Sequence, residues 1–137
     1  MKYEIYIYEE AKTASFYKKA IAEYEKRLSR YCKISCHFIK KKKEWEKLCT
    51  SIEKGIFLFP GTQSISSEEF STQIKNWEMS GQGKIHFFIS SPDDVYAGSK
   101  EQLHLSSFTM DTAMSAMILY EQIYRGYRIL NNHPYHK

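Results

Sequence analysis

The sequence predicts a single α/β domain, residues 1–137, with a mostly parallel sheet and helices on both of its faces. The length of 137 residues is enough for one compact domain and too short for two. Short apolar runs typical of strands alternate with longer segments in which apolar residues recur every three or four positions, as in helices. Strands that alternate with helices favour a parallel sheet covered by helices.

The first part of the chain predicts two strands, each followed by a helix. Residues 3–7 alternate apolar and polar side chains, the pattern of a strand with one buried face. Residues 14–31 place apolar and aromatic side chains at steps of four and three, which predicts a helix with one apolar stripe. Residues 34–38 alternate again as a second strand, and residues 45–52 predict a short second helix.

Two further strands flank a capped helix in the middle of the chain. Residues 56–59 have no polar side, which is typical of a central strand covered on both faces. Ser66 and Glu69 have the spacing of a capping box, so a helix should begin there. Residues 85–89 predict the fourth strand, and residues 90–94 predict a loop.

The last part predicts a short fifth strand at Leu103 and Leu105 and a final helix capped by Asp111 or Thr112. One side of this helix carries residues at helical spacing: Met114, Met117, Ile118, Glu121 and Tyr124. The order of the strands in the sheet does not follow from these patterns.

Composition and termini indicate a cytoplasmic protein with no membrane segment. No stretch approaches the roughly 20 apolar residues needed to span a bilayer. The first ten residues carry acids where a signal peptide requires an apolar core. Cys32, Cys36 and Cys49 form an odd set whose spacing matches neither a zinc site nor a redox pair, so reduced, partly buried thiols are favoured over a metal site.

Positive charge is concentrated in the first part of the chain. The whole chain carries a formal net charge of +4, and residues 1–54 hold 14 Lys and Arg against 8 Asp and Glu. The surplus peaks in the four lysines of residues 40–43. Such a run is usually a solvated loop, and it permits RNA binding without establishing it.

Common catalytic motifs are absent, but the last 14 residues have an unusual composition. Aromatic and cationic side chains crowd there: Tyr124, Arg125, Tyr127, Arg128, His133, Tyr135, His136 and Lys137. Such side chains stack on unpaired bases and pair with phosphates. A C-terminal helix with a solvated tail explains the same composition, and the two interpretations stay open at this point.

Four segments resemble the ribosomal RNA large subunit methyltransferase H family. They are residues 20–32 (AIAEYEKRLSRYC), 66–70 (SSEEF), 121–125 (EQIYR) and 134–137 (PYHK), in the same order over nearly the whole chain. The resemblance implies a SPOUT-type fold, in which the C-terminal part forms a deep trefoil knot, and a homodimer.

The resemblance also implies an activity. Members of this family transfer a methyl group from S-adenosylmethionine to N-3 of a pseudouridine in large-subunit (23S) rRNA of the assembled ribosome. The reaction is an in-line displacement, so such an enzyme must align nucleophile and donor and help a proton leave the base. The expected cofactor is S-adenosylmethionine, the expected partners are a second copy of the chain and the rRNA, and no metal is required.

Matching the family pattern residue by residue implies two sets of site residues. The cofactor-binding set is Leu58, Ser90, Ser91, Ser106, Ser107, Phe108, Thr109, Met110 and Asp111. The catalytic set is Arg125, Tyr135 and His136. Arg125 would orient phosphate or base, or else form a salt bridge on the helix or dimer surface. Tyr135 and His136 would lie at the edge of the partner subunit's cofactor pocket, where His136 could accept or relay a proton.

Several positions depart from the family pattern. Ser90 and Ser91 replace paired glycines, where a Cβ can crowd a ligand. Asp111 and Thr112 replace a Pro-His pair, and Ala116 replaces an arginine. Two functions therefore remain: an active methyltransferase, favoured because the substrate-end residues are present, and a catalytically silent relative that keeps the knotted dimer and ribosome binding.

Overall fold

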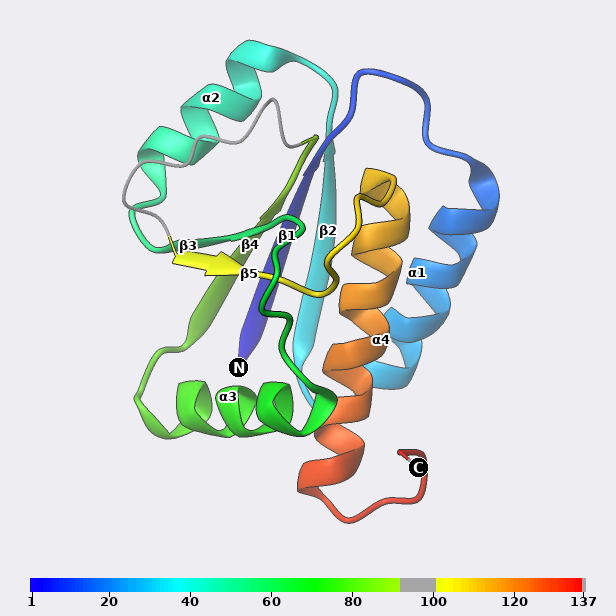
Figure 1. Cartoon of the computed structure of the whole chain (residues 1–137), viewed down its shortest axis with the longest axis vertical. Coiled ribbons are helices and arrows are strands. Elements are labelled where there is room, and N and C mark those ends of the chain that lie inside the picture. Colours follow the sequence, from blue (N-terminus) through cyan, green and yellow to red (C-terminus); the bar gives the residue numbers. More distant parts are fainter. Residues whose placement is uncertain (92–100, 137) are drawn as a thin grey trace.

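The computed structural model describes residues 1–91 and 101–136, which form a five-stranded parallel sheet with helices on both faces (Figure 1). In chain order the elements are β1 (Lys2–Tyr8), α1 (Ser15–Leu28), β2 (Lys33–Ile39), α2 (Lys42–Ser51), β3 (Gly55–Leu58), α3 (Ser67–Met79), β4 (Lys84–Ile89), β5 (Glu101–Leu103) and α4 (Thr112–Leu130). The predicted fold class is confirmed. The trefoil knot stays a prediction, and the predicted loop after Ser91 falls on residues outside the described ranges.

The strands lie in the order β2-β1-β4-β3-β5, and every neighbouring pair is parallel. β1 therefore lies between β2 and β4, although β4 comes much later in the chain. The first crossover runs outward from β1 to β2, while β3 and β5 lie on the other side of β4. Such a reversal of strand order creates a crevice at the carboxyl ends of the strands, where open α/β sheets bind ligands.

Two apolar clusters cover the faces of the sheet. The larger joins β1 and β4 to α1, α3 and α4 around Tyr3, Phe87 and Tyr120, each of them 0% exposed. The smaller cluster packs α2 onto the opposite face of the sheet through Trp45. The rings of Phe57 and Phe88 stack on each other, and both lie edge-on to the Trp45 ring. The central strands β1, β3 and β4 are thus covered by amphipathic helices.

None of the three cysteines forms a disulfide bond within the described ranges. Cys49 is fully buried, and burial raises the pKa of Cys32 and of Cys36 to about 12. Thiols held in the protonated form are poor nucleophiles and poor metal ligands. Within the described ranges there is no group of three or more His, Cys, Asp or Glu suited to a metal ion.

The two predicted helix caps have different outcomes. Ser66 and Glu69 form the full capping box at the start of α3, with reciprocal bonds of 3.1 Å. Asp111 is the N-cap residue of α4 as predicted, but its side chain makes no capping bond. Thr112 instead donates from Oγ1 to Glu9 Oε2 at 3.2 Å, because the helix begins against the end of β1.

Two other expectations need correction. The fifth strand covers Glu101–Leu103 and ends before Leu105, because the chain after Leu103 turns to bond with the segment that follows β3. The lysine run is not wholly a loop, since Lys42 and Lys43 form the first turn of α2. Lys40 is also tied down, because its Nζ donates to the carbonyl of Ala11 at 2.6 Å.

The chain folds back after α4. Asn132 has a φ of 55°, a left-handed conformation that asparagine tolerates better than most residues. His133 N then donates to Arg128 O at 2.8 Å. This turn directs residues 133–136 along α4, near the lower end of the molecule in Figure 1. Among the described helices, none is long and apolar enough to cross a membrane.

Candidate cofactor and substrate site

The predicted cofactor-binding residues lie at one edge of the sheet. Leu58 ends β3 and is aligned with Ile89, so that Ser90 follows β4 at the same level. Leu58 is also aligned with Leu103 of β5, and residues 106–111 link β5 to α4. The three segments therefore meet at the carboxyl ends of neighbouring strands, the edge where parallel sheets bind ligands.

Backbone hydrogen bonds fix the segments after β3 and β5 against each other. Gly61 N donates to Ser106 O at 3.0 Å, and Ile65 N donates to His104 O at 3.1 Å. The ring of His104 bonds through Nδ1 to Phe59 O at 2.9 Å. A Cβ on Gly61 would lie 2.5 Å from that ring, so this close approach requires glycine. Glycine at position 61 therefore has a local structural role.

The hollow between these segments is too small for the expected cofactor. Its lining includes Leu58, Pro60, Ser106, Phe108, Met110 and Ser115, and it holds about 20 Å³. That volume accommodates about one water molecule, whereas ligand pockets usually measure about 300–1,000 Å³. The apolar lining fits the cofactor in kind, but the hollow must widen before the cofactor can enter.

Ser90 and Ser91 lie beside this hollow without lining it. Ser90 is buried, and its Oγ donates to the carbonyl of Ser91 at 3.1 Å. Ser107, Phe108 and Thr109 are exposed, and Phe108 shows 69% of its surface to solvent. An exposed phenylalanine at the rim marks the part of the hollow that can open with the least loss of packing.

The three predicted catalytic residues come together around α4. Arg125 donates from Nε and Nη2 to Glu121 Oε1, at 3.0 and 2.6 Å. Tyr135 OH donates to the same oxygen at 3.2 Å, and the guanidinium lies 5.0 Å from the centre of the Tyr135 ring. Arg125 Nη1 lies 3.0 Å from His136 Nδ1. The folded-back tail thus joins helix and C-terminal residues in one cluster.

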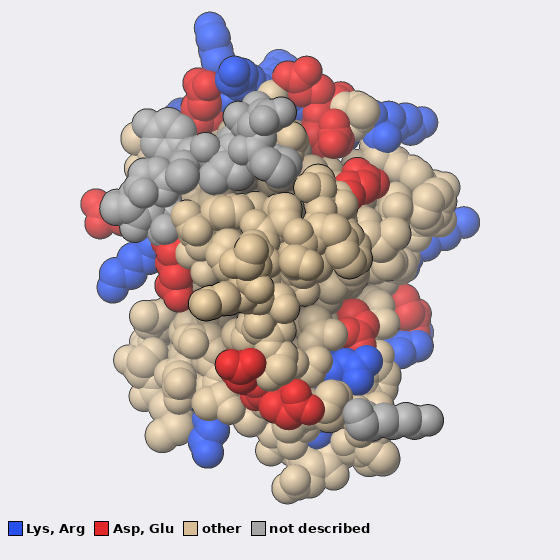
Figure 2. All heavy atoms as spheres, in the orientation of Figure 1, with Lys and Arg blue, Asp and Glu red and all other residues tan. Residues whose placement is uncertain are grey.

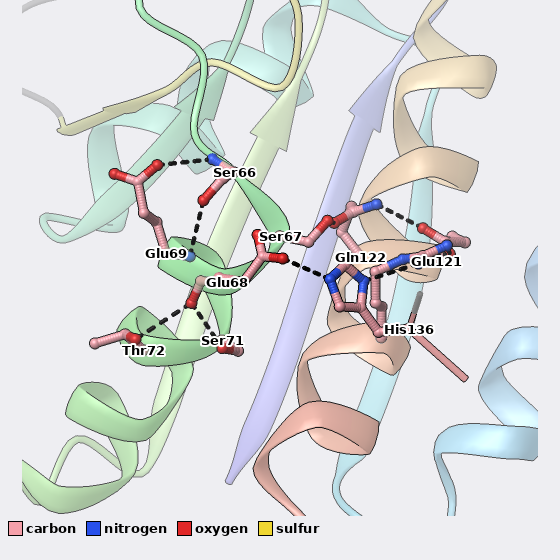
Figure 3. A network of polar contacts seen from close by, with 10 residues as sticks. Ser66, Ser67, Glu68, Glu69, Ser71, Thr72, Glu121, Gln122 and His136 are labelled. Carbon is pink, nitrogen blue, oxygen red and sulfur yellow. Dashed lines mark hydrogen bonds and ion pairs between the residues drawn. The ribbon is translucent and has the colours of Figure 1, made fainter. Parts of the chain in front are cut away.

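His136 also reaches α3. Its Nε2 lies 2.6 Å from Oε1 of Glu68, and Figure 3 shows the ring between α3 and α4. Next to it, Ser67 donates from Oγ to Gln122 Oε1 at 2.7 Å, which ties the start of α3 to the middle of α4. The tail, α3 and α4 therefore meet at this point.

Local electrostatics keep these groups in defined states. The hydrogen bonds to Glu121 raise the pKa of Arg125. Burial raises the pKa of Tyr135, whose phenol therefore stays protonated at neutral pH. The pKa of Glu68 is lowered by a hydrogen bond from the backbone N–H of Glu68 and by the bond from His136, so this residue is a carboxylate at neutral pH. The cluster therefore presents a cation, a phenol and an imidazole flanked by two carboxylates.

Glu68 and Glu121 are site residues that sequence analysis missed. Glu121 precedes Arg125 by four positions, a spacing that indicates an ion pair on one helix face. Glu68 lies inside a segment that resembles the family, but nothing in its local sequence indicates a histidine 68 positions away.

Within one subunit, the small hollow at the carboxyl ends of the strands lies apart from the cluster of Arg125, Tyr135 and His136. Ser115 lines the hollow, and Glu121 lies six residues further along α4, which is about 9 Å along the helix axis. A second hollow of about 250 Å³ shares Leu105 with the first, and Ser67 and Gln122 also line it. No hydrogen bond joins the two sets within the described ranges.

A larger hollow of about 1,000 Å³ lies elsewhere. Gly55, Lys84 and Glu101 line it, so it lies at the amino ends of β3, β4 and β5. Polar side chains of the α2–β3 link and of the end of α3 surround it. Because ligands of open parallel sheets bind at the carboxyl ends, we place the candidate site at the other edge despite its smaller hollow.

Comparisons with known proteins identify the family. The family described as a predicted SPOUT methyltransferase matches residues 1–136. The chain is 36% identical over 137 residues, all of both chains, to ribosomal RNA large subunit methyltransferase H 1 of Thermoanaerobacter sp. (strain X514). It is 32% identical to the putative enzyme of that name from Methanocorpusculum labreanum, covering 90% of this chain and 92% of the relative. It is 33% identical to ribosomal RNA large subunit methyltransferase H of Clostridium botulinum (strain Kyoto / Type A2), covering 89% and 91%. This chain therefore belongs to the SPOUT methyltransferase family.

Proposed function

We propose that this protein is an S-adenosylmethionine-dependent rRNA methyltransferase that methylates N-3 of a pseudouridine in the large ribosomal subunit. The full-length similarity to relatives named ribosomal RNA large subunit methyltransferase H supports this activity. The observation that carries it is the convergence of Arg125, Tyr135 and His136 in one cluster next to α3. The enzyme is proposed to act as a homodimer in the cytoplasm.

The cofactor binds at the carboxyl ends of β3 and β4 in this proposal. When bound, S-adenosylmethionine supplies an electrophilic methyl group on a sulfonium. Leu58 and the backbone of residues 106–110 hold it, Ser90 and Ser91 border it, and the exposed Asp111 places a negative charge nearby. A carboxylate near the cationic sulfonium favours its binding.

The clustered residues act on the RNA. Arg125 binds a phosphate through Nη1, since a hydrogen bond between a guanidinium and a phosphate is charge-assisted. Tyr135, protonated and partly exposed, stacks against a base. His136 takes the N-3 proton as the nitrogen attacks the methyl carbon. The tail is proposed to complete the cofactor pocket of the partner subunit.

A catalytically silent relative is the second candidate. The hollow of about 20 Å³ is the observation in its favour, because it admits no cofactor without movement. The names of the relatives favour the enzyme, since each describes a methyltransferase.

The deciding experiment measures transfer of labelled methyl from S-adenosylmethionine to ribosomes from a strain that lacks its own enzyme of this type. We expect incorporation by the wild type, at one pseudouridine of the large-subunit rRNA, and a loss of about 100-fold or more in His136→Ala with ribosome binding retained. Binding of these ribosomes without any methyl transfer by the wild type would establish the silent relative instead.

A further inference from the structure

Both ring nitrogens of His136 have partners. Arg125 Nη1 lies 3.0 Å from Nδ1, and Glu68 Oε1 lies 2.6 Å from Nε2. A guanidinium only donates hydrogen bonds, so Nδ1 must carry the lone pair that accepts from Arg125. The ring hydrogen is then on Nε2, where it is donated to the carboxylate of Glu68. The bonding partners thus assign one tautomer to the neutral ring.

Glu68 is held in place by α3 and not by the tail. It lies in the first turn of α3, which the capping box of Ser66 and Glu69 begins at a fixed residue. The bond between Ser67 and Gln122 joins this turn to α4. The backbone of Glu68 is therefore part of a rigid element, and the tail brings His136 to its carboxylate, as Figure 3 shows.

Arg125 uses its donors on two different groups. Nε and Nη2 both bond to Glu121, and Nη1 alone bonds to His136. An RNA phosphate can therefore bind Nη1 while the other two bonds persist. Only one hydrogen bond has to change partner to uncover Nδ1.

We propose that Glu68 is the positioning residue that makes His136 a proton acceptor at Nδ1, and that Arg125 covers Nδ1 until an RNA phosphate binds the guanidinium. The inference rests on the proposed methyl transfer to N-3 and adds Glu68 to its machinery. In the reaction the N-3 proton moves to Nδ1 and the N-3 electron pair forms the bond to the methyl carbon. The carbon–sulfur bond breaks, its electron pair stays on sulfur, and S-adenosylhomocysteine leaves. The imidazolium keeps its Nε2–H on the Glu68 carboxylate, whose charge stabilises it.

The charged groups that face the ring set the direction of each expected change. They are Glu68 from α3 and Arg125 and Glu121 from α4, with the Tyr135 phenol alongside on the tail. Removing the Glu68 charge makes the ring harder to protonate, whereas removing the Arg125 charge makes it easier.

The first test needs no cofactor. Proton binding by His136 is followed by ¹⁵N NMR in the cofactor-free protein as pH is varied. We expect Glu68→Gln to move the pH of half-protonation downward and Arg125→Ala to move it upward. Glu69→Gln is the matched control, because it removes the same charge from the same helix turn and its amide can still accept the capping bond from Ser66. Equal titrations in Glu68→Gln, Glu69→Gln and wild type would overturn the proposal.

The second test separates positioning from mere tail attachment. In steady-state methyl transfer to ribosomes, Glu68→Gln should lower kcat by roughly 10- to 100-fold with KM for ribosomes little changed. The acidic limb of its pH–rate profile should move to lower pH, and Glu68→Asp should recover part of the rate. A fall in kcat with an unmoved pH limb would assign Glu68 a structural role only and refute the proposal.

These outcomes are distinct from failure of the proposed function. The pH of half-protonation could move in opposite directions in Glu68→Gln and Arg125→Ala while the wild type transfers no methyl group. That result would refute the proposed methyltransferase activity but support the Glu68–His136 pair. Methyl transfer at the wild-type rate in Glu68→Gln would refute the positioning role of Glu68 but support the proposed methyltransferase activity. Thermal unfolding of each variant confirms that the fold is intact.

Discussion

Glu121 is the residue that holds the cluster of Arg125 and Tyr135 together. Its Oε1 accepts from two nitrogens of Arg125 and from the hydroxyl of Tyr135, and its Oε2 accepts from Gln122. Both members of the ion pair are partly buried, with side-chain exposures of 25% and 19%. One carboxylate thus holds a cation and a phenol in fixed positions, and its loss should free both.

Glu121→Gln should therefore lower the free energy of unfolding by about 1–2 kcal/mol, since hydrogen bonds to charged groups contribute about 1.5–3 kcal/mol and the Gln oxygen still accepts in part. It should also weaken ribosome binding, because Arg125 loses its orientation. Urea unfolding and ribosome binding measure the two effects. Glu23→Gln, which removes the exposed pair with Arg27 at the same helical spacing, is the control and should cost less than about 0.5 kcal/mol. Equal losses in both variants would contradict the special role of Glu121.

Glu4 predicts how stability changes with pH. Burial would raise the pKa of Glu4, but hydrogen bonds from His37, Lys2 and Ser35 outweigh it and hold this pKa at about 2. A carboxyl whose folded pKa lies below its unfolded value stabilises the fold above the unfolded pKa of about 4.5, and this stability is lost as pH falls toward 2. Wild type should therefore lose about 3 kcal/mol between pH 5 and pH 2 from this group. Glu4→Gln should lack that share of the loss in urea titrations at each pH, and identical pH profiles would disprove the assignment.

The segment between β5 and α4 is the element on which the proposed cofactor binding depends. Backbone bonds from the segment after β3 fix its first part at His104 and Ser106, whereas Ser107, Phe108 and Thr109 are exposed. An anchored start and an exposed middle allow the rim to open while the sheet edge stays in place.

S-adenosylhomocysteine should therefore raise the unfolding temperature of the wild type, because ligand at about 100 times its dissociation constant adds roughly 2.7 kcal/mol. The paired replacement Ser90→Gly with Ser91→Gly should bind more tightly by calorimetry, since it removes side chains beside the hollow. The control for added backbone freedom is the paired replacement Ser29→Gly with Ser80→Gly. These two serines lie outside the candidate site, at the ends of α1 and α3. No protection of the wild type at millimolar ligand would favour the silent relative.

At the scale of the whole molecule, charge and apolar surface are unevenly distributed. Figure 2 shows Lys, Arg, Asp and Glu mostly toward the edges of this view, with a largely uncharged central area over the segment that follows β5. Phe108 contributes an exposed ring there, and Met114, Met117 and Ile118 of α4 are only partly buried. Uncharged surface with exposed apolar side chains suits a contact with a second copy.

We predict a homodimer by light scattering at micromolar concentration, with each site built from two subunits. Mixing His136→Ala with Ser106→Trp, which fills the cofactor hollow, should then restore about a quarter of wild-type methyl transfer. In an equal mixture about half of all dimers contain one subunit of each variant, and one of the two sites in each such dimer is intact. If tail and hollow serve the same subunit, the mixture should be as inactive as the two variants alone. Prior calorimetry on Ser106→Trp confirms that the cofactor no longer binds.

Local periodicity was sufficient to predict most elements of this chain. The alternation in β1, the fully apolar β3 and the capping box at Ser66 all act within a few residues, so their consequences are visible in the sequence. The family resemblance also predicts Arg125, Tyr135 and His136 as site residues. These features depend on steric and hydrogen-bonding preferences that each short segment carries with it.

Tertiary structure alone decided how these pieces combine. The place of β4 beside β1, the early end of β5 and the bond of Thr112 to Glu9 in place of a cap all depend on contacts between distant segments. The bond from His136 to Glu68 joins residues 68 positions apart, and it exists only because the turn at Asn132 returns the tail to α3 and α4. Such contacts depend on the packing of the whole chain, because no local preference of either residue selects its partner.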